Sequence, residues 1–331
     1  MKKKKVVLTF DYELFFGDKS GTVYNTLIYP TNMLMDAMEK VGFRGNFFID
    51  YLMLIKLREQ RDLYCKRDLI AIESQIYDMI RRGHRIELHI HPHWRDARYN
   101  GNGTWNFDNF THYSLNSFSK DDIKKMFVEG ANLLNSLARQ IDPGYCVVAF
   151  RAGGWAIQPF ELLEEGFRSS GIFLDSSVMT GVEIITDYSY CNFLSVVQPS
   201  DGYYRFTNNV DIQDKNGRYV EVPISSIKRN FLSRLVGRIA NIYGVNYKTL
   251  ADGTHFRKSN SPDKWNSSTG KSVCTFSTVS PLDSLIRLLF SPDSILCYID
   301  HPKDLSKSTI PSIKAVSLFS KSLFLSDFIN I

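Results

Sequence analysis

The sequence predicts an α/β fold in the form of a closed or nearly closed barrel. Short apolar strands alternate with helical segments along the whole chain, and alternation of this kind is typical of a parallel sheet. About seven such repeats fit into the 331 residues, which favours a barrel over a doubly wound open sheet, the main alternative. No linker and no internal repeat divides the chain, so we expect residues 1–331 to form a single domain.

Each predicted element has its own local signal. Strands are predicted where short apolar runs end in turn or polar residues, at residues 6–13, 46–49, 84–91, 145–150, 171–176, 219–224, 295–299 and 323–325. Helices are predicted from apolar residues three and four apart, with Gly42 and Gly83 as stop signals of the first two, at residues 30–41, 68–82, 121–139, 159–170, 230–243, 282–290 and 313–320. Two long irregular segments, at residues 94–119 and 247–280, are predicted to be functional lids or binding loops. A third irregular segment, at residues 179–218, includes a turn-like stretch at residues 214–217 and is predicted to form a hairpin.

Composition narrows the class of protein. A hydrophobic content of 44% with 23% charged residues is typical of a globular chain and not of a disordered one. No apolar run reaches the ~20 residues of a membrane span, and the apolar stretch after the first lysines is too short for a secretory signal, so we expect a cytoplasmic protein. The five cysteines are scattered and show no C-x-x-C pair, which argues against a disulfide framework or a zinc ribbon. No basic stripe with interleaved aromatic residues indicates nucleic-acid binding, and the oligomeric state is left open.

Two carboxylates leave the first predicted strand together. Asp11 and Glu13 are separated by Tyr12, and side chains alternate along a strand, so both acids point to the same side. A salt-bridged strand end is the simpler interpretation of such a pair taken alone. Polar groups at the ends of the other strands make a functional interpretation stronger.

Three histidines stand at the end of another predicted strand, in HRIELHIHPHW. Strand periodicity places His89, His91 and His93 on one face, and Pro92 is expected to end the strand and let His93 share a target with His89. Neutral imidazoles that converge with a carboxylate can hold a zinc or similar divalent ion and leave a position open for water. His84, at the other end of this strand, is expected to make a structural contact.

Further titratable residues follow the later strands. Arg151 can orient a carboxylate, and the glycines after it in FRAGGW allow backbone N–H groups to approach an oxyanion. Asp175 in LDSS and His301 in YIDHP stand at two more strand ends. Because barrel enzymes carry their active sites at the carboxyl ends of the strands, this pattern predicts an active site there.

The ordered series TFDYE, GHRIELHIHPHW, FRAGGW, LDSS and IDHP resembles the five motifs of the polysaccharide deacetylases, the NodB-homology or carbohydrate esterase family four group. The resemblance covers nearly the whole chain, and its most specific part is the G-H-x-I-x-x-H-x-x-x-H spacing. The cytoplasmic branch that modifies sugars for O-antigen or capsule synthesis (WbmS-like proteins) is the most similar. The resemblance implies a distorted (β/α)7 barrel and metal-dependent removal of an acetyl group from an N-acetylated sugar.

The resemblance also implies a role for each matching residue. The implied catalytic residues are Asp11 as general base, Arg151 as its orienter, Gly154 as oxyanion donor, His301 as general acid, and Asp175 as the group that holds the tautomer of His301. The implied ligands of one divalent ion, most simply Zn²⁺, are His89, His93 and a first-strand carboxylate, Glu13. The chain departs from the family where Tyr12 replaces a second adjacent aspartate, and where two glycines, Gly153 and Gly154, replace a proline and an aromatic residue.

Aromatic residues near these motifs are candidates for binding the sugar. The segment directly after the histidines is rich in aromatic groups, whose faces can pack on the apolar face of a pyranose. The predicted substrate-binding residues are Trp94, Trp105, Tyr113 and Trp155. Some residues of the segment are expected to anchor it to the barrel instead.

Other functions remain open from the sequence. Asp11 and Glu13 can supply the two carboxyl groups of a retaining glycosidase, although the histidines would then have no purpose. Another metal-dependent hydrolase, including a binuclear amidohydrolase built on His89 and His91, is a second alternative. A noncatalytic carbohydrate-binding homologue is a third.

Overall fold

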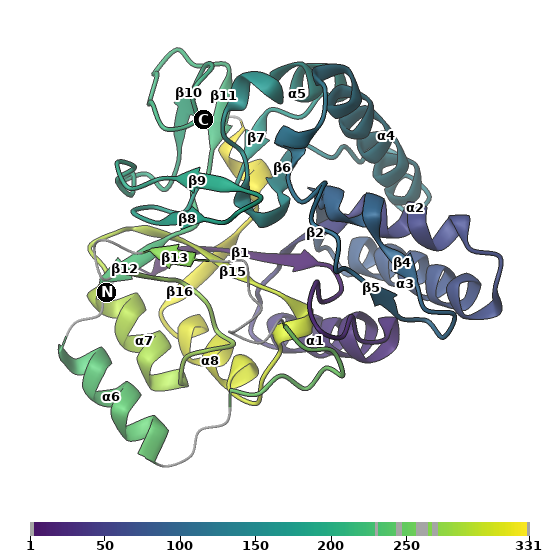
Figure 1. The fold of residues 1–331 in the computed structure, drawn as a ribbon. Coiled ribbons are helices and arrows are strands. Elements are labelled where there is room, and N and C mark those ends of the chain that lie inside the picture. The colour runs from purple at the N-terminus through teal and green to yellow at the C-terminus, as the bar shows by residue number, and fades with distance from the viewer. Residues whose placement is uncertain (1–2, 229–230, 243–246, 256–263, 267–270, 330–331) are drawn as a thin grey trace.

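The structure is a computed structural model that describes residues 3–228, 231–242, 247–255, 264–266 and 271–329. It shows a mixed α/β fold with a curled, mostly parallel central sheet that forms a half-barrel (Figure 1). Barrel-like α/β architecture is therefore confirmed at this level.

The central sheet has nine strands. Its order is β10-β11-β7-β6-β3-β2-β1-β15, with β16 also paired to β1, and only β10 runs antiparallel to its neighbour. The strands are β1 (Lys4–Tyr12), β2 (Asn46–Asp50), β3 (Arg85–Ile90), β6 (Ala149–Ala152), β7 (Leu174–Asp175), β10 (Tyr204–Phe206), β11 (Tyr219–Glu221), β15 (Ile295–Asp300) and β16 (Ser320–Leu323).

The two ends of the curled sheet approach each other through short backbone contacts. Just after β11, the Ser225 N–H donates to the Cys297 carbonyl of β15 at 3.0 Å. The Cys274 N–H donates to the Ser225 carbonyl at 2.8 Å, and the Ile299 N–H donates to the Cys274 carbonyl at 3.0 Å. These bonds connect β15 with the segment after β11, so the sheet wraps around a common interior.

The alternation of side chains along each strand divides the sheet into an inner and an outer face. Val7 of β1 packs inside with Phe48, Ala149 and Leu174, and Phe328 belongs to the same inner cluster. The alternate residues of β1, Val6, Leu8, Phe10 and Tyr12, pack outside, in the larger core beneath the helices. Polar residues of β1 that lie an even number of positions from Val7, such as Asp11, therefore point into the interior of the half-barrel.

Helices cover the outer face (Figure 1). They are α1 (Tyr29–Glu39), α2 (Tyr51–Glu59), α3 (Leu63–Arg81), α4 (Lys120–Ala138), α5 (Glu164–Ser170), α7 (Pro281–Phe290) and α8 (Thr309–Ser317). The helix α6 (Phe231–Ile242) packs against α7. The predicted strands and helices are largely present, with shifted ends. Helix α2 is not predicted from the sequence, because it begins directly after β2 and no turn residue separates the two apolar runs.

The three segments expected to be irregular contain short strands of their own. Residues 94–119 include a small hairpin, and residues 179–218 include an antiparallel pair and the strand β10. These elements are β4 (Arg98–Tyr99), β5 (Trp105–Asn106), β8 (Glu183–Ile185), β9 (Tyr190–Asn192), β13 (Lys264–Asn266) and β14 (Lys271–Val273). Outside these segments, β12 (Ser226–Lys228) pairs antiparallel with β14. Part of the segment 247–280 lies outside the described residues.

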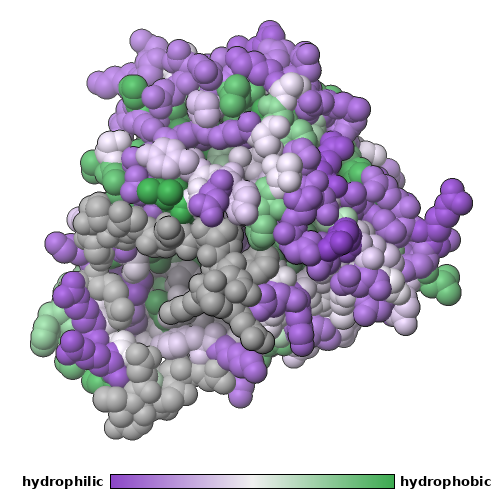
Figure 2. All heavy atoms as spheres, viewed as in Figure 1, coloured by the Kyte–Doolittle hydropathy of each residue, from purple (hydrophilic) through white to green (hydrophobic). Residues whose placement is uncertain are grey.

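The face of the molecule seen in Figure 2 is mostly hydrophilic, with separate apolar groups between the polar ones. Within the described residues, no helix is both long and apolar enough to cross a membrane. All five cysteines are unpaired thiols, and four of them are buried.

His84 makes a structural contact and gives a first testable prediction. Its Nδ1 accepts a hydrogen bond from the Gly45 N–H at 3.1 Å, and its Nε2 lies 3.2 Å from the Glu39 carboxylate. Burial lowers the pKa of His84 from 6.5 to about 4, despite the hydrogen bond with Glu39. Protonation of His84 Nδ1 would remove the acceptor of the hydrogen bond from Gly45, so the folded state favours the neutral imidazole.

We expect His84 to make the protein less stable in acid. The unfolded chain takes up a proton at His84 below pH 6.5, whereas the folded chain does so only near pH 4. The contribution of His84 to the free energy of unfolding is therefore lost as the pH falls from 6.5 to about 4. Urea unfolding measures the free energy of unfolding at pH 7 and at pH 4.5. We expect this free energy to fall by about 2 kcal/mol more in the wild type than in His84→Gln between the two pH values. Equal losses in the two proteins would show that His84 does not titrate in this way.

Candidate functional site

Four polar residues face the interior at the carboxyl ends of β1, β2, β3 and β6. Asp50 is in register with His89, and His89 is in register with Arg151, so their side chains share one face. Asp11 is in register with Phe48, an inner residue. All four residues are at most 3% exposed. Parallel register thus brings together groups that are far apart in the sequence, as the sequence analysis expected for Asp11, His89 and Arg151.

Asp11 is held by a buried ion pair. Arg151 Nη1 donates to Asp11 Oδ1 at 2.7 Å, and Arg151 is completely buried. The rest of the guanidinium group is fixed as well, because Nε donates to the Ser176 carbonyl at 2.7 Å and Nη2 donates to Ser176 Oγ at 3.0 Å. The guanidinium also lies over the ring of Phe48 at 4.3 Å. Arg151 therefore orients Asp11 and leaves Oδ2 for another partner.

Glu13, the second carboxylate of the first motif, is bound on both oxygens. Lys303 Nζ donates to Oε1 at 2.7 Å, and His89 Nε2 lies 2.9 Å from Oε2. Burial raises the pKa of Glu13, but the Lys303 ammonium and the hydrogen bond from His89 outweigh burial and hold this pKa well below its usual value. Glu13 is therefore an ionised carboxylate between two cationic groups.

His89 is one of those cationic groups. Its Nδ1 lies 2.8 Å from the Arg151 carbonyl, which can only accept, and its Nε2 faces the ionised Glu13 carboxylate. Both ring nitrogens consequently donate, which requires the imidazolium form. Burial lowers the pKa of His89, but the hydrogen bond to Glu13 and the charge of Asp11 raise it to about 9.

His301 completes the cluster from the end of β15. Its Nε2 lies 3.6 Å from Asp11 Oδ2 and 3.7 Å from Glu13 Oε1, and its Nδ1 lies 3.4 Å from Asp304. The His301 side chain is 19% exposed, far more than Asp11 or Glu13. His301 is therefore the member of the cluster that solvent or a ligand reaches first.

Three residues of this cluster, Asp50, Lys303 and Asp304, are not predicted from the sequence. Lys303 and Asp304 follow His301 within IDHPKD, and Lys303 turns inward to Glu13. Asp50 ends β2 beside His89, and burial raises its pKa to about 7. Asp50 had a signal in the sequence, because it ends an apolar strand just as Asp11 does.

Asp175, predicted to hold the tautomer of His301, lies elsewhere. Its neighbour Leu174 is the residue of β7 that packs inside, so Asp175 points to the outer face, in register with Phe150 and Glu221. Its oxygens accept hydrogen bonds from Ser177 N–H at 2.9 Å and Ser177 Oγ at 2.8 Å. Among the described residues, the carboxylate beside His301 Nδ1 belongs to Asp304 and not to Asp175.

His93 also lies away from the cluster, because a 3-10 turn over Pro92–Asp96 follows β3. The His93 ring packs among aromatic rings, with centroids 4.9 Å from Phe110 and 5.5 Å from Phe107. Burial lowers the pKa of His93 to about 4, so its imidazole is neutral. His91, between the two other histidines, lies under Phe16 at a centroid distance of 4.0 Å.

The predicted zinc site requires Glu13, His89 and His93 to converge on one point. The structure brings Glu13 and His89 together but leaves His93 in its aromatic pocket, and no group of three metal-binding side chains is found within the described part of the chain. His89 Nδ1 faces the Arg151 carbonyl, and Nε2, the nitrogen left for a metal, is in direct contact with Glu13 at 2.9 Å. The donor set in this arrangement does not fit a three-ligand zinc ion, and zinc binding stays a prediction of the sequence.

The two glycines of FRAGGW are required by close packing at the end of β6. A Cβ atom on Gly153 would lie 2.7 Å from the Ile90 carbonyl oxygen and 2.8 Å from the His91 ring. Gly154 has a φ of 60°, and Trp155 has a φ of 57°, a left-handed conformation that is rare for a tryptophan. The turn therefore carries the backbone past His91 in a strained form, as is common at functional sites. The role of the Gly154 N–H as an oxyanion donor stays a prediction.

The four aromatic residues predicted to bind a sugar divide into two pairs. Trp94 and Trp105 are buried, with ring centroids 5.1 Å apart, and belong to the core that anchors the segment after the histidines. Their burial leaves no ring face for a sugar, so the structure contradicts their assignment as a binding surface. Tyr113 and Trp155 are only partly buried and stay candidates for binding a sugar. The ring centroids of Tyr113 and His91 are 5.7 Å apart.

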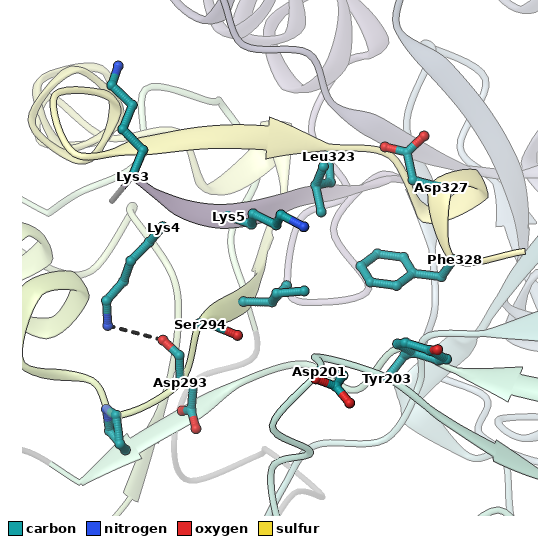
Figure 3. Close-up of a pocket in the computed structure, with 12 residues that line it drawn as sticks. Lys3, Lys4, Lys5, Asp201, Tyr203, Asp293, Ser294, Leu323, Asp327 and Phe328 are labelled. Atoms are coloured by element: carbon teal, nitrogen blue, oxygen red, sulfur yellow. Dashed lines mark hydrogen bonds between the residues drawn. The ribbon is translucent and has the colours of Figure 1, made fainter. Parts of the chain in front are cut away.

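A cavity of about 700 Å³ lies at the opposite end of the sheet, beside the start of β1 and β15 (Figure 3). Lys3, Lys5, Tyr203 and Phe328 are among its lining residues. None of the predicted site residues lines it. The titratable cluster, and not this cavity, is therefore the candidate active site.

Comparisons with known proteins add no relative. No protein-family model matches the chain, and no curated protein matches it. The function is therefore inferred from the residues of the cluster and their geometry.

Proposed function

We propose that this chain is a hydrolase that removes the acetyl group from an N-acetylated sugar. The observation that carries the proposal is the contact of Asp11 with both Arg151 and His301 at the carboxyl ends of β1, β6 and β15. Arg151 fixes Oδ1 of the Asp11 carboxylate, and the His301 imidazole lies beside Oδ2. This arrangement supplies a carboxylate base with an imidazole next to its free oxygen.

The roles follow from the positions of these groups. Asp11 Oδ2, which Arg151 leaves free, would take a proton from the attacking water. His301, the more exposed group, would give a proton to the departing sugar amine. The Lys303 ammonium and the His89 imidazolium place positive charge beside Glu13, where it would favour a tetrahedral oxyanion nearby.

The finer assignments from the sequence belong to the same proposal. The half-barrel would correspond to the distorted (β/α)7 barrel of the polysaccharide deacetylases, and the protein would act in the cytoplasm on sugars for a surface polysaccharide. The order of Asp11, His89, Arg151 and His301 along the chain, together with their common place at the strand ends, supports this assignment.

A panel of N-acetylated sugars, free, nucleotide-linked and lipid-linked, tests the proposal. Purified protein is incubated with each compound, as purified, after chelation and with added zinc, and the products are identified by mass spectrometry. We expect one class of compound to lose a single acetyl group and release acetate. Cleavage of a glycosidic bond instead would identify a glycosidase, and sugar binding without acetate release would identify a noncatalytic carbohydrate-binding protein.

A further inference from the structure

The helix α6 (Phe231–Ile242) presents an apolar face to solvent. Phe231 is 79% exposed, and Leu232, Leu235 and Ile239 are between 42% and 47% exposed. These residues stand on one side of a helix with 3.6 residues per turn, because positions 232, 235 and 239 are three and four apart. Ser233 and Ala240, on the other side, are buried. The helix is therefore attached to the protein by small residues and turns its large apolar residues outward.

Positive charge borders this apolar face. Arg234 and Arg238 are both exposed, and the sequence of α6 contains no acidic residue. Neither arginine forms an ion pair or a hydrogen bond with the residues that the structure describes. Both line a cavity of about 380 Å³ between α6 and α7, to which Arg287 and its ion-pair partner Asp283 also contribute. Figure 2 shows apolar and strongly hydrophilic groups side by side along the edge where α6 lies in Figure 1.

We propose that α6 docks the protein on the surface of an anionic lipid bilayer, with its apolar face inserted among the acyl chains and its arginines on the headgroups. Exposed apolar residues bordered by arginine are what an interfacial helix requires. A bilayer matches both features at once, because it offers an apolar layer directly beneath negative charge. A second copy bound through the same face would instead bring two sets of Arg234 and Arg238 together, and these like charges would repel each other.

Co-sedimentation of the full-length protein with vesicles tests this docking. We expect binding to vesicles that contain phosphatidylglycerol, weak binding to pure phosphatidylcholine vesicles, and loss of binding as salt is raised. Leu235→Glu and Ile239→Glu are expected to weaken the partition coefficient about ten-fold or more, because each removes apolar burial from the acyl layer. Arg234→Glu with Arg238→Glu is expected to remove the preference for the anionic lipid.

Leu63→Glu is the matched control, since Leu63 is 81% exposed and lies on α3. It is expected to bind vesicles as the wild type does. Circular dichroism identifies any variant that fails to fold, and Leu235→Trp gives an independent reading, because bromolipids in the bilayer are expected to quench its fluorescence above the wild-type background. Equal binding to both lipids, unchanged binding of the α6 variants, or a dimer in light scattering that these variants dissociate would overturn the proposal.

Discussion

Asp11→Asn is expected to lower acetate release about 100-fold or more while the protein stays folded, because asparagine cannot take a proton from water. Asparagine has nearly the shape of aspartate and keeps one acceptor for Arg151, which lies 2.7 Å from Oδ1. The loss should fall on kcat more than on KM, since the proton moves only in the chemical step. Steady-state kinetics on the substrate found in the sugar panel measures the effect.

Glu87→Gln is the matched control for this variant. Glu87 is also a buried inner carboxylate with an arginine partner, because Arg85 Nε donates to its Oε1 at 2.8 Å, but it lies at the other end of β3. Its replacement is expected to change stability and to leave kcat close to the wild-type value. If Asp11→Asn keeps its activity while Glu13→Gln loses it, the two carboxylates have exchanged roles.

The part of the site that the sequence predicts rests on strand periodicity. Asp11 lies on β1 and Glu13 directly follows this strand, and their separation by two positions leaves both carboxylates on the side of His301. His89 falls opposite Arg151 because neighbouring parallel strands end together. Regular strands of this length fix the direction of every side chain. The barrel-like α/β class was predictable for the same reason, since each strand and helix has its own period.

Periodicity gives no guide where strands are short or end in turns. The strand β7 has only two residues, so the sequence does not tell which of Leu174 and Asp175 points inward. Pro92 ends β3, as predicted, but the 3-10 turn that follows carries His93 into an aromatic pocket and away from His89. Lys303 follows a strand in the same way, and only the three-dimensional arrangement shows that its side chain reaches Glu13 across 290 positions of sequence.

The pair Glu13 and Lys303 gives the second large effect. Both side chains are at most 6% exposed, and Lys303 Nζ also donates to the Leu14 carbonyl at 3.1 Å. Removal of one partner of a buried ion pair leaves an uncompensated charge, so Lys303→Met and Glu13→Gln are each expected to lower the free energy of unfolding by about 3 kcal/mol. Lys303→Arg keeps the charge and should lose less, which gives a folded variant if the methionine variant does not fold.

A double-mutant cycle separates the pair from its surroundings. In the double variant Glu13→Gln with Lys303→Met neither charge remains, so we expect its loss of stability to be about 2 kcal/mol smaller than the sum of the single losses. Urea unfolding at pH 7 supplies the four free energies. The exposed pair of Arg98 and Asp108 has the same separation of 2.7 Å, and its cycle is expected to show a coupling close to zero because solvent screens it. Additive losses at Glu13 and Lys303 would contradict the prediction, because they would mean that the ammonium does not neutralise the carboxylate.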